Sequence, residues 1–487
     1  EIKDFYEIHG RAEAYKELSP DEGAYYDGCV EIDLSTIKPM IALPFHPSCA
    51  VSIEDFKANM EDLLAETEKR AKVSFGTEDF TLRDKIRNGQ FYVEQGIIAG
   101  CAGGGFENIC AAADILRGGN IGSDEFTLSV YPSSMPVYME LIKNGRAADL
   151  MAAGAVLKTA FCGPCFGAGD TPSNGAFSIR HSTRNFPNRE GSKPGAGQIA
   201  SVALMDARSI AATAANKGYL TAATELDTDY NIPKYFFDKS IYDTRVYDSK
   251  GVADPAQEIK QGPNIKDWPK MSALADNLLI KVVSVITDPV TTTDELIPSG
   301  ETSSYRSNPL GLAEFTLSRK DPLYVGEAKQ VRALEEARAA GNVEPEAEKA
   351  LKLAGFNAEN TGMGSTIFAV KPGDGSAREQ AASCQKVLGG AANIAREYAT
   401  KRYRSNLINW GMVPFLYDGE DLPFEKGQWV AVPGIRDAIA AGETSFKALL
   451  VDPVAETTKE IRLKMDPLTA DEKEIILKGC LINYYRD

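Results

Sequence analysis

Three cysteines and two arginines have the residue types and the spacing that could do chemistry. Cys162 and Cys165 form a Cys-x-x-Cys pair, and Cys101 lies upstream of them. Three thiols suit a metal cluster held by three protein ligands instead of four, which leaves one position open for a substrate. Arg184 and Arg189 follow closely, and guanidinium groups bind carboxylates. The pattern therefore predicts a cluster site that acts on a carboxylate-bearing substrate.

Two other interpretations of the Cys-Gly-Pro-Cys segment have to be weighed. It is also the thioredoxin redox sequence, in which the second Cys lies in the opening turn of a helix. Here residues 166–175 are rich in Gly, Asp, Pro, Ser and Asn, which predicts a loop and disfavours a redox pair. A structural zinc site would need a fourth ligand, for which Cys110 is the candidate. Cys110 falls on the apolar face of a predicted helix, where a buried thiol is the simpler interpretation, so zinc is kept only as an alternative.

The elements around the cysteines alternate between strand and helix patterns. The predicted strands cover 96–100, 126–131, 156–161 and 176–179, and the predicted helices cover 106–116, 135–144 and 199–215. This alternation predicts a doubly wound α/β domain. Cys101 and Cys162 each follow the end of a strand, so both should lie at the ligand-binding edge of one sheet.

The chain divides into four predicted parts. They are a tail of a preceding α/β domain (1–75, with a strand at 30–34 and a helix at 53–72), a cluster-bearing α/β domain (76–228), a linker (229–270) and a C-terminal domain (271–487). The last part opens with a strand over 278–286 and contains a charged helical stretch over 327–353.

Composition limits the possible partners. A net charge of −16 over 487 residues should repel nucleic acid. The sequence has no apolar run long enough to cross a bilayer, so a membrane is not an expected partner. Eight cysteines are too sparse for a disulfide scaffold and indicate a reducing, cytoplasmic setting.

At these residues the chain resembles the aconitase family of iron–sulfur hydro-lyases. Cys101, Cys162 and Cys165 match the three ligands of the family's [4Fe-4S] cluster, the last two in its CGPC motif. Residues 184–189 resemble the substrate-binding motif NRNFxGR, which assigns substrate contacts to Arg184 and Arg189. Thr183 stands where that motif has Asn, and we include it as a substrate-binding position. The resemblance implies a three-layer α/β/α domain followed by a C-terminal swivelling β/β/α domain.

A second set of candidate residues lies in the C-terminal domain. Residues 373–379 resemble the family loop GxGSSRE, which implies that Ser376 is the catalytic base and that Arg378 binds the developing oxyanion and a carboxylate. Ala377 replaces the second Ser of the motif. Without the resemblance, Ser376 and Glu379 form an S-x-x-E capping box, which explains both residues structurally.

Residues 292–294 resemble the family segment TTDH. The resemblance implies a catalytic role for Asp294 and a substrate-binding role for Arg306, twelve residues further on. Glu295 occupies the position of the family's His. Taken alone, Asp294 would be a turn residue and Arg306 a surface residue.

The resemblance implies a reversible dehydration and hydration that isomerises a hydroxy-tricarboxylate such as citrate or isocitrate through aconitate. The family's acid-bearing N-terminal domain has no counterpart in this sequence, so that domain is the expected partner and the fragment alone is expected to be inactive. The alternative is a non-catalytic iron–sulfur sensor or interaction protein of the same fold.

Overall fold

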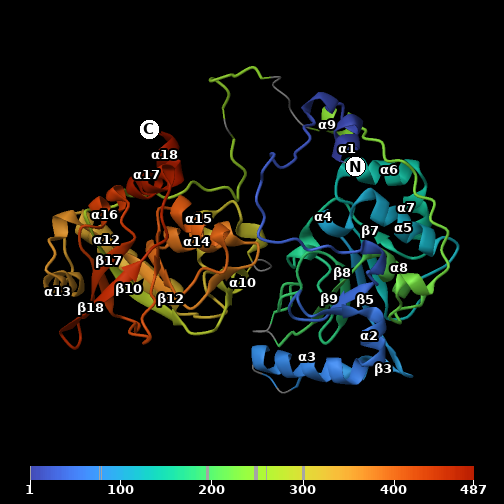
Figure 1. The fold of residues 1–487 in the computed structure, drawn as a ribbon, viewed down its shortest axis with the longest axis horizontal. Helices are drawn as coiled ribbons and strands as arrows, with labels where there is room; N and C mark the ends of the chain where they lie inside the picture. Colours follow the sequence, from blue (N-terminus) through green and yellow to red (C-terminus); the bar gives the residue numbers. More distant parts are fainter. Residues whose placement is uncertain are drawn as a thin grey trace. The chain divides into compact units, whose positions relative to one another are not determined.

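A computed structural model describes residues 2–75, 77, 79–193, 197–245, 251–258, 260–298 and 302–486. The chain splits into two compact units, unit 1 (Glu1–Gln257) and unit 2 (Glu258–Asp487) (Figure 1). The division between them falls inside the segment 229–270 that the sequence predicts as a linker.

Unit 1 is built on a seven-stranded sheet with the strand order β2-β1-β9-β8-β5-β6-β7. These strands are β1 (Met40–Ala42), β2 (Ala50–Ser52), β5 (Gln95–Ile98), β6 (Thr127–Val130), β7 (Val156–Leu157), β8 (Phe177–His181) and β9 (Ser201–Met205). Strands β5 to β9 pair in parallel with one another, whereas β1 pairs antiparallel with both β2 and β9. A separate short hairpin joins β3 (Ile86–Arg87) to β4 (Gln90–Phe91).

One face of this sheet is covered by helices. The helices of unit 1 are α1 (Ile2–Ile8), α2 (Ile53–Ala58), α3 (Met60–Phe75), α4 (Gly100–Gly103), α5 (Phe106–Leu116), α6 (Met135–Lys143), α7 (Arg146–Ala152), α8 (Ala207–Ala215) and α9 (Ser240–Asp243). Ile98, Ile179 and Ala203 enter the main core together with the apolar side of α5 and α8. Since strand side chains alternate between faces, Gln95, Ser178 and Arg180 lie on the opposite face.

The predicted α/β class is confirmed, because unit 1 combines helices with a largely parallel sheet and unit 2 combines helices with a closed barrel. The helix predicted over 199–215 is wrong in its first half, because 201–205 form β9 and α8 begins only at Ala207. Asp206 accepts a hydrogen bond from the Ser209 amide (2.9 Å) and so starts the helix. A buried parallel strand is continuously apolar, so its pattern resembles that of a buried helix.

The strand predicted over 30–34 is also wrong. These residues form no strand, and Val30 and Leu34 are 86% and 80% exposed. An alternating pattern makes a strand only where a neighbouring strand pairs with it. Strands β1 and β2 lie in the same predicted part of the chain, residues 1–75. They belong to the same sheet as β5 to β9, so this part of the chain shares its sheet with the predicted cluster-bearing domain.

Unit 2 contains a closed barrel with the strand order β10-β12-β14-β15-β18-β17-β16. Its strands are β10 (Asn277–Ile286), β12 (Thr361–Ala369), β14 (Gly390–Ala395), β15 (Val413–Leu416), β16 (Trp429–Val432), β17 (Ser445–Asp452) and β18 (Thr457–Lys464). Strands β10, β12, β14 and β15 pair in parallel, and the remaining pairs are antiparallel. Beside the barrel, β11 (Thr291–Thr292) pairs with β13 (Pro372–Asp374).

Helices pack around this barrel. They are α10 (Thr293–Leu296), α11 (Pro309–Ala313), α12 (Tyr324–Ala339), α13 (Pro345–Ala354), α14 (Arg378–Val387), α15 (Lys401–Asn409), α16 (Ile435–Ala441), α17 (Ala470–Lys478) and α18 (Leu481–Arg486). Neighbouring β10 residues enter two different apolar clusters: Leu279 packs in one and Ile280 in the other. The barrel wall is therefore buried on both sides, which gives β13, α14 and α15 a rigid support.

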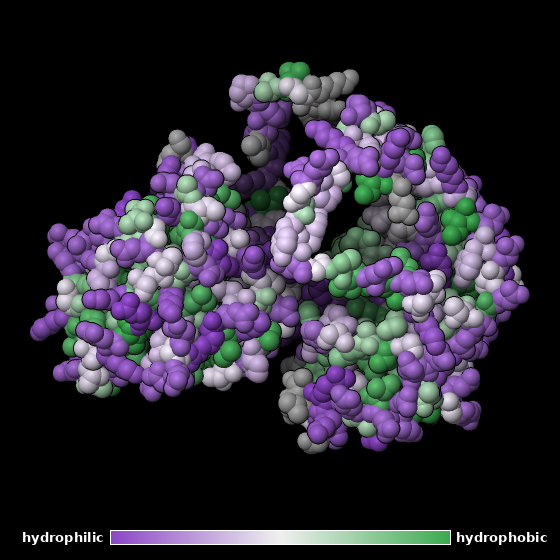
Figure 2. All heavy atoms as spheres, in the orientation of Figure 1, coloured by the Kyte–Doolittle hydropathy of each residue, from purple (hydrophilic) through white to green (hydrophobic). Residues whose placement is uncertain are grey.

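The face shown in Figure 2 is mainly hydrophilic over each unit, with hydrophobic residues scattered among polar ones. Among the described residues, no helix combines the length and the apolar character that a membrane crossing requires.

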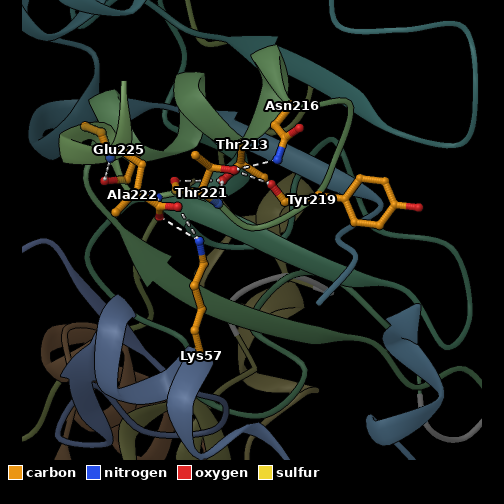
Figure 3. Close-up of polar contacts among 9 residues, drawn as sticks. Lys57, Thr213, Asn216, Tyr219, Thr221, Ala222 and Glu225 are labelled. Atoms are coloured by element: carbon orange, nitrogen blue, oxygen red, sulfur yellow. Dashed lines mark hydrogen bonds and ion pairs between the residues drawn. The ribbon is translucent and has the colours of Figure 1, made fainter. Parts of the chain in front are cut away.

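A polar network fastens the end of α8 to the segment that follows it (Figure 3). The buried Thr213 hydroxyl accepts a hydrogen bond from the Thr221 amide at 3.1 Å, and the Asn216 side chain donates to the Thr221 hydroxyl at 2.9 Å. Glu225 then accepts from the Ala222 amide (2.7 Å) and from the half-exposed Lys57 ammonium (2.6 Å).

We expect Thr213→Val to lower the free energy of unfolding of unit 1 by about 1–3 kcal/mol, because it leaves the buried Thr221 amide without an acceptor. Lys57→Met removes only a half-exposed ion pair and should lower it by less than about 1 kcal/mol. Urea denaturation of the full chain measures both values. Equal losses for the two variants would contradict this ranking.

Candidate functional site

The three predicted ligand cysteines follow strands of one parallel sheet. Cys101 lies in α4, directly after β5, and Cys162 and Cys165 lie after β7, the latter in the short 3-10 helix Gly163–Cys165. Strands β5 and β7 both pair in parallel with β6, so the two segments leave the sheet at the same edge. Cys101 and Cys162 are exposed, whereas Cys165 is buried.

The thiols are close together, and Gly100 makes room for them. Gly100 has a φ of +68°, and a Cβ at this position would lie 2.9 Å from the Cys165 Sγ and 3.9 Å from the Cys162 Sγ. Any other residue would therefore push into the thiols and strain the backbone. Burial, reinforced by the hydrogen-bonded Cys162 thiol and by Cys101, raises the pKa of Cys165 to about 12.

The three cysteine thiols together fit a cluster with three protein ligands. In the part of the chain that the structure describes, no three His, Cys, Asp or Glu side chains already surround one metal position. The Cys162 and Cys165 thiols nonetheless lie beside Gly100, a residue without a side chain, and Cys101 is near enough to raise the pKa of Cys165. A bound metal deprotonates a coordinating thiol outright. The donor chemistry matches iron–sulfur ligation.

Two further glycines hold Cys101 in place. A Cβ on Gly103 would lie 2.5 Å from the His181 carbonyl oxygen, and one on Gly104 would lie 2.4 Å from the Tyr131 carbonyl oxygen. The turn that carries Cys101 therefore packs directly against the strand ends. His181 accepts a hydrogen bond from the Ala207 amide (3.1 Å), and burial lowers its pKa, as befits a structural histidine.

Arg180 lies beneath the Cys162–Cys165 segment and ties it to the sheet. Its side chain is 1% exposed. It donates to the Pro164 carbonyl (2.7 Å) and to the Asp170 carbonyl (2.8 Å). It also donates to the Ser178 hydroxyl (3.0 Å) and to the Gln95 side-chain oxygen (3.1 Å). Burial lowers the pKa of Arg180 to about 10, an effect that Glu190 and Asp170 oppose.

The sequence analysis did not identify Arg180 as a functional residue. Arg180 stands inside a buried strand, and a charge at such a position must be paired and hydrogen-bonded to be tolerated. This charged residue in a strand could have identified Arg180 from the sequence. Its hydrogen-bond partners could not have been predicted, because Pro164 and Asp170 belong to a loop whose path the sequence does not fix.

Arg184 and Arg189 lie beside the cysteines. They line one narrow gap together with Cys165, too small to admit a water molecule. Arg189 is 8% exposed, and Arg184, which donates to the Thr183 carbonyl (2.7 Å), is partly buried. The neighbouring Asn185 anchors this loop by donating to the Leu43 carbonyl at 2.8 Å. Neither arginine is a free surface residue, which favours a defined role over simple solvation.

In unit 2 the two predicted segments meet through the β11–β13 pair. Thr292 is in register with Asp374, and the Ala377 amide donates to the Thr293 hydroxyl at 3.3 Å. A Cβ on Gly375 (φ +129°) would lie 2.3 Å from the same hydroxyl. Asp294 is buried and pairs with Arg319 at 3.2 Å, while Arg306 is exposed in the stretch between α10 and α11.

The capping box predicted for Ser376 and Glu379 is wrong. Helix α14 begins after Ala377, whose side chain makes no cap, and Glu379 instead accepts from the Trp410 indole at 3.0 Å. A capping box forms at α10, where Thr292 is the N-cap and Glu295 its partner. This contact explains why an acidic residue stands at position 295.

Ser376 and Arg378 line an open cavity of about 380 Å³. Its wall also carries Lys401 and Arg402 from the first turn of α15. Cations in the first turn oppose the helix dipole. Their gathering around Ser376 makes this cavity suited to an anionic ligand.

The chain matches two protein-family models. Residues 3–212 match "Aconitase family (aconitate hydratase)", and residues 329–420 match "Aconitase C-terminal domain".

Curated relatives agree with these models. A mitochondrial aconitate hydratase of Arthroderma benhamiae is 27% identical over 424 residues, which cover 82% of this chain and 50% of that protein. The 3-isopropylmalate dehydratase large subunit of Caldanaerobacter subterraneus is 26% identical, over 47% of this chain and 45% of its own length. The corresponding subunit of Campylobacter jejuni is 31% identical, over 38% of this chain and 39% of its own length. The chain thus spans about half the length, or less, of these relatives. A solved 3-isopropylmalate dehydratase from Methanocaldococcus jannaschii matches at 20% identity and a TM-score of 0.27, over 43% of this chain and 93% of that one.

We expect Arg180→Met to destabilise unit 1 by about 1–3 kcal/mol, because it leaves the buried Pro164 carbonyl without its donor and removes one of the two donors to the Asp170 carbonyl and to the Gln95 oxygen. Amide hydrogen exchange should rise first in the segment 163–170. Arg117→Met, which removes an exposed arginine, should cost less than about 1 kcal/mol and leave that segment protected. Unchanged exchange in Arg180→Met would disprove the anchoring role.

Proposed function

Because the chain belongs to the aconitase family, we propose that it is part of a [4Fe-4S]-dependent hydro-lyase that reversibly dehydrates and rehydrates a hydroxy-tricarboxylate such as citrate or isocitrate. The observation that carries this proposal is the grouping in unit 1. Three thiols lie at one sheet edge, and the innermost, Cys165, shares a gap with Arg184 and Arg189.

Cys101, Cys162 and Cys165 would hold the cluster. When bound with one iron open, it supplies a Lewis acid that polarises the substrate hydroxyl and one carboxylate. Gly100 leaves space beside these thiols, and Arg180 holds the loop that carries Cys162 and Cys165 against the sheet.

The arginines of unit 1 bind and orient the substrate. Arg184 and Arg189 each present a planar fork that matches a carboxylate in two hydrogen bonds. The Asn185 anchor holds the loop between them on β1, so the two guanidinium groups keep a fixed spacing. Thr183 offers a hydroxyl where the family motif has an amide, which changes one substrate contact.

Unit 2 contributes the base. Ser376 acts as an alkoxide, which Arg378 at the start of α14 and the helix N-terminus stabilise. It takes the proton from the substrate carbon and becomes a neutral hydroxyl, while the electron pair of the broken C–H bond forms the double bond as the substrate hydroxyl leaves. Arg306 adds a further carboxylate contact. Asp294 pairs with Arg319 and so holds α10 against the segment that follows α11, while the neighbouring Thr293 hydroxyl contacts the loop of Ser376.

The substrate class follows from the number of cations, since Arg184, Arg189, Arg306 and Arg378 together favour a polyanion. The changes at Thr183, Ala377 and Glu295 make a divergent specificity plausible, and relatives of both the aconitate hydratase and the 3-isopropylmalate dehydratase kinds match the chain. The chain spans half of the length of these relatives or less. We therefore expect the group that protonates the leaving hydroxyl to lie in the full-length gene product, and activity is to be tested there.

The ligand assignment predicts the result of anaerobic reconstitution with iron and sulfide. The chain should take up a [4Fe-4S] cluster, visible in its absorption and, after reduction, in its EPR spectrum. Cys101→Ala, Cys162→Ala and Cys165→Ala should each fail to assemble it. Cys110→Ala, in which a buried thiol with a pKa near 12 is removed, should assemble it normally. A zinc-loaded, iron-free product, or an intact cluster in Cys165→Ala, would overturn the assignment.

The assignment of the base predicts a kinetic signature in the full-length gene product. Ser376→Ala should lower kcat for aconitate hydration by about 10²–10⁴-fold while KM changes little, because the hydroxyl acts only in the transition state. Ser405→Ala, in the wall of the same cavity, is the matched control and should retain kcat. Cluster assembly without hydration of any tricarboxylate or hydroxy-dicarboxylate would favour the sensor alternative.

A further inference from the structure

Unit 2 holds a second cavity, of about 190 Å³, away from the cavity of Ser376. It lies between the segment 269–275, the start of β12 and the Gly389-Gly390 turn that follows α14. Gly389 has a φ of +95°, and no side chain from this turn fills the space. A cavity of about 150 Å³ already accommodates benzene, so this one has room for a small organic molecule.

Lys386 is the unusual residue of this cavity. It lines the wall from the last turn of α14, and among the described residues its ammonium group has no hydrogen-bond or ion-pair partner. The residue is half-buried, and burial lowers its pKa to about 8, an effect that the Cys480 thiol opposes. A partly desolvated ammonium group without a charged partner is a favourable contact for an anion that enters the cavity.

The other charges of the cavity are already matched. Glu336 accepts from Arg332 (2.8 Å). Glu335 accepts from Arg338 (2.6 Å) and from the Met363 amide (3.0 Å). Lys270 is exposed at the rim. Lys386 therefore contributes one unmatched positive charge inside the cavity, which a singly charged anion would neutralise.

About half of the cavity wall is apolar. Met271, Leu278, Met363 and Val387 belong to this part of the lining. Such walls favour an aliphatic body over a hydrated inorganic ion. From this combination we propose that the cavity is a second ligand site, which binds a small monocarboxylate with a short aliphatic chain through Lys386. None of its residues belongs to the proposed hydro-lyase site, so the two proposals stand or fall separately.

Butyrate is a suitable probe, and its binding to the full chain can be followed by ligand-detected NMR titration. Lys386→Met keeps the length and the apolar character of the side chain but removes the charge. It should weaken butyrate binding by about tenfold or more. Its melting temperature should equal or exceed that of the parent chain, because a half-buried charge without a charged partner is removed.

Two controls make the result specific. Lys352→Met changes an exposed lysine on α13 and should leave butyrate binding unchanged. Butanol, which has the same aliphatic body without a carboxylate, should bind the parent chain and Lys386→Met equally weakly. Equal butyrate affinity in the parent chain and Lys386→Met, butanol binding as tight as butyrate binding, or no saturable butyrate binding at all would each overturn the proposal.

Discussion

The buried guanidinium of Arg180 is the interaction on which unit 1 depends. A charge without access to water is tolerated only when its donors are satisfied, and this one donates to two carbonyls and two side chains. The carbonyls belong to Pro164 and Asp170, so the loop with Cys162 and Cys165 cannot leave the sheet without stranding the charge. These hydrogen bonds hold the loop against the sheet, whereas a surface loop without such contacts would be free to move.

The same sheet edge explains why cysteines and arginines from distant segments meet. Parallel pairing brings the ends of β5, β7 and β8 to one side, and glycines allow their turns to pack backbone against backbone. Arg184 and Arg189 reach that side because β8 lies next to β5 and because Asn185 ties their loop to β1. The geometry of the thiols thus follows from strand order.

Unit 2 also brings distant segments of the chain together, but through a short strand pair beside its barrel. A two-stranded pair, β11 with β13, brings the Thr293 hydroxyl against the loop of Ser376, and Gly375 allows the close approach. The first turns of α14 and α15 then place Arg378, Lys401 and Arg402 around one cavity. Ser376 consequently faces a concentration of positive charge that no single segment of the sequence contains.

The sequence by itself determined the fold class and identified the three thiols and the arginines as candidates, because residue type and spacing within a motif can be read without knowledge of the fold. It predicted α5 and β6 closely but mistook β9 for helix, since a buried parallel strand and a buried helix are both continuously apolar. It assigned Ser376 and Glu379 to a capping box, whereas Trp410, 31 positions away from Glu379, is the actual partner. Only the tertiary structure decided such contacts, along with the burial of Arg180 and the position of Lys386 in a cavity wall, because they depend on which distant segments pack together.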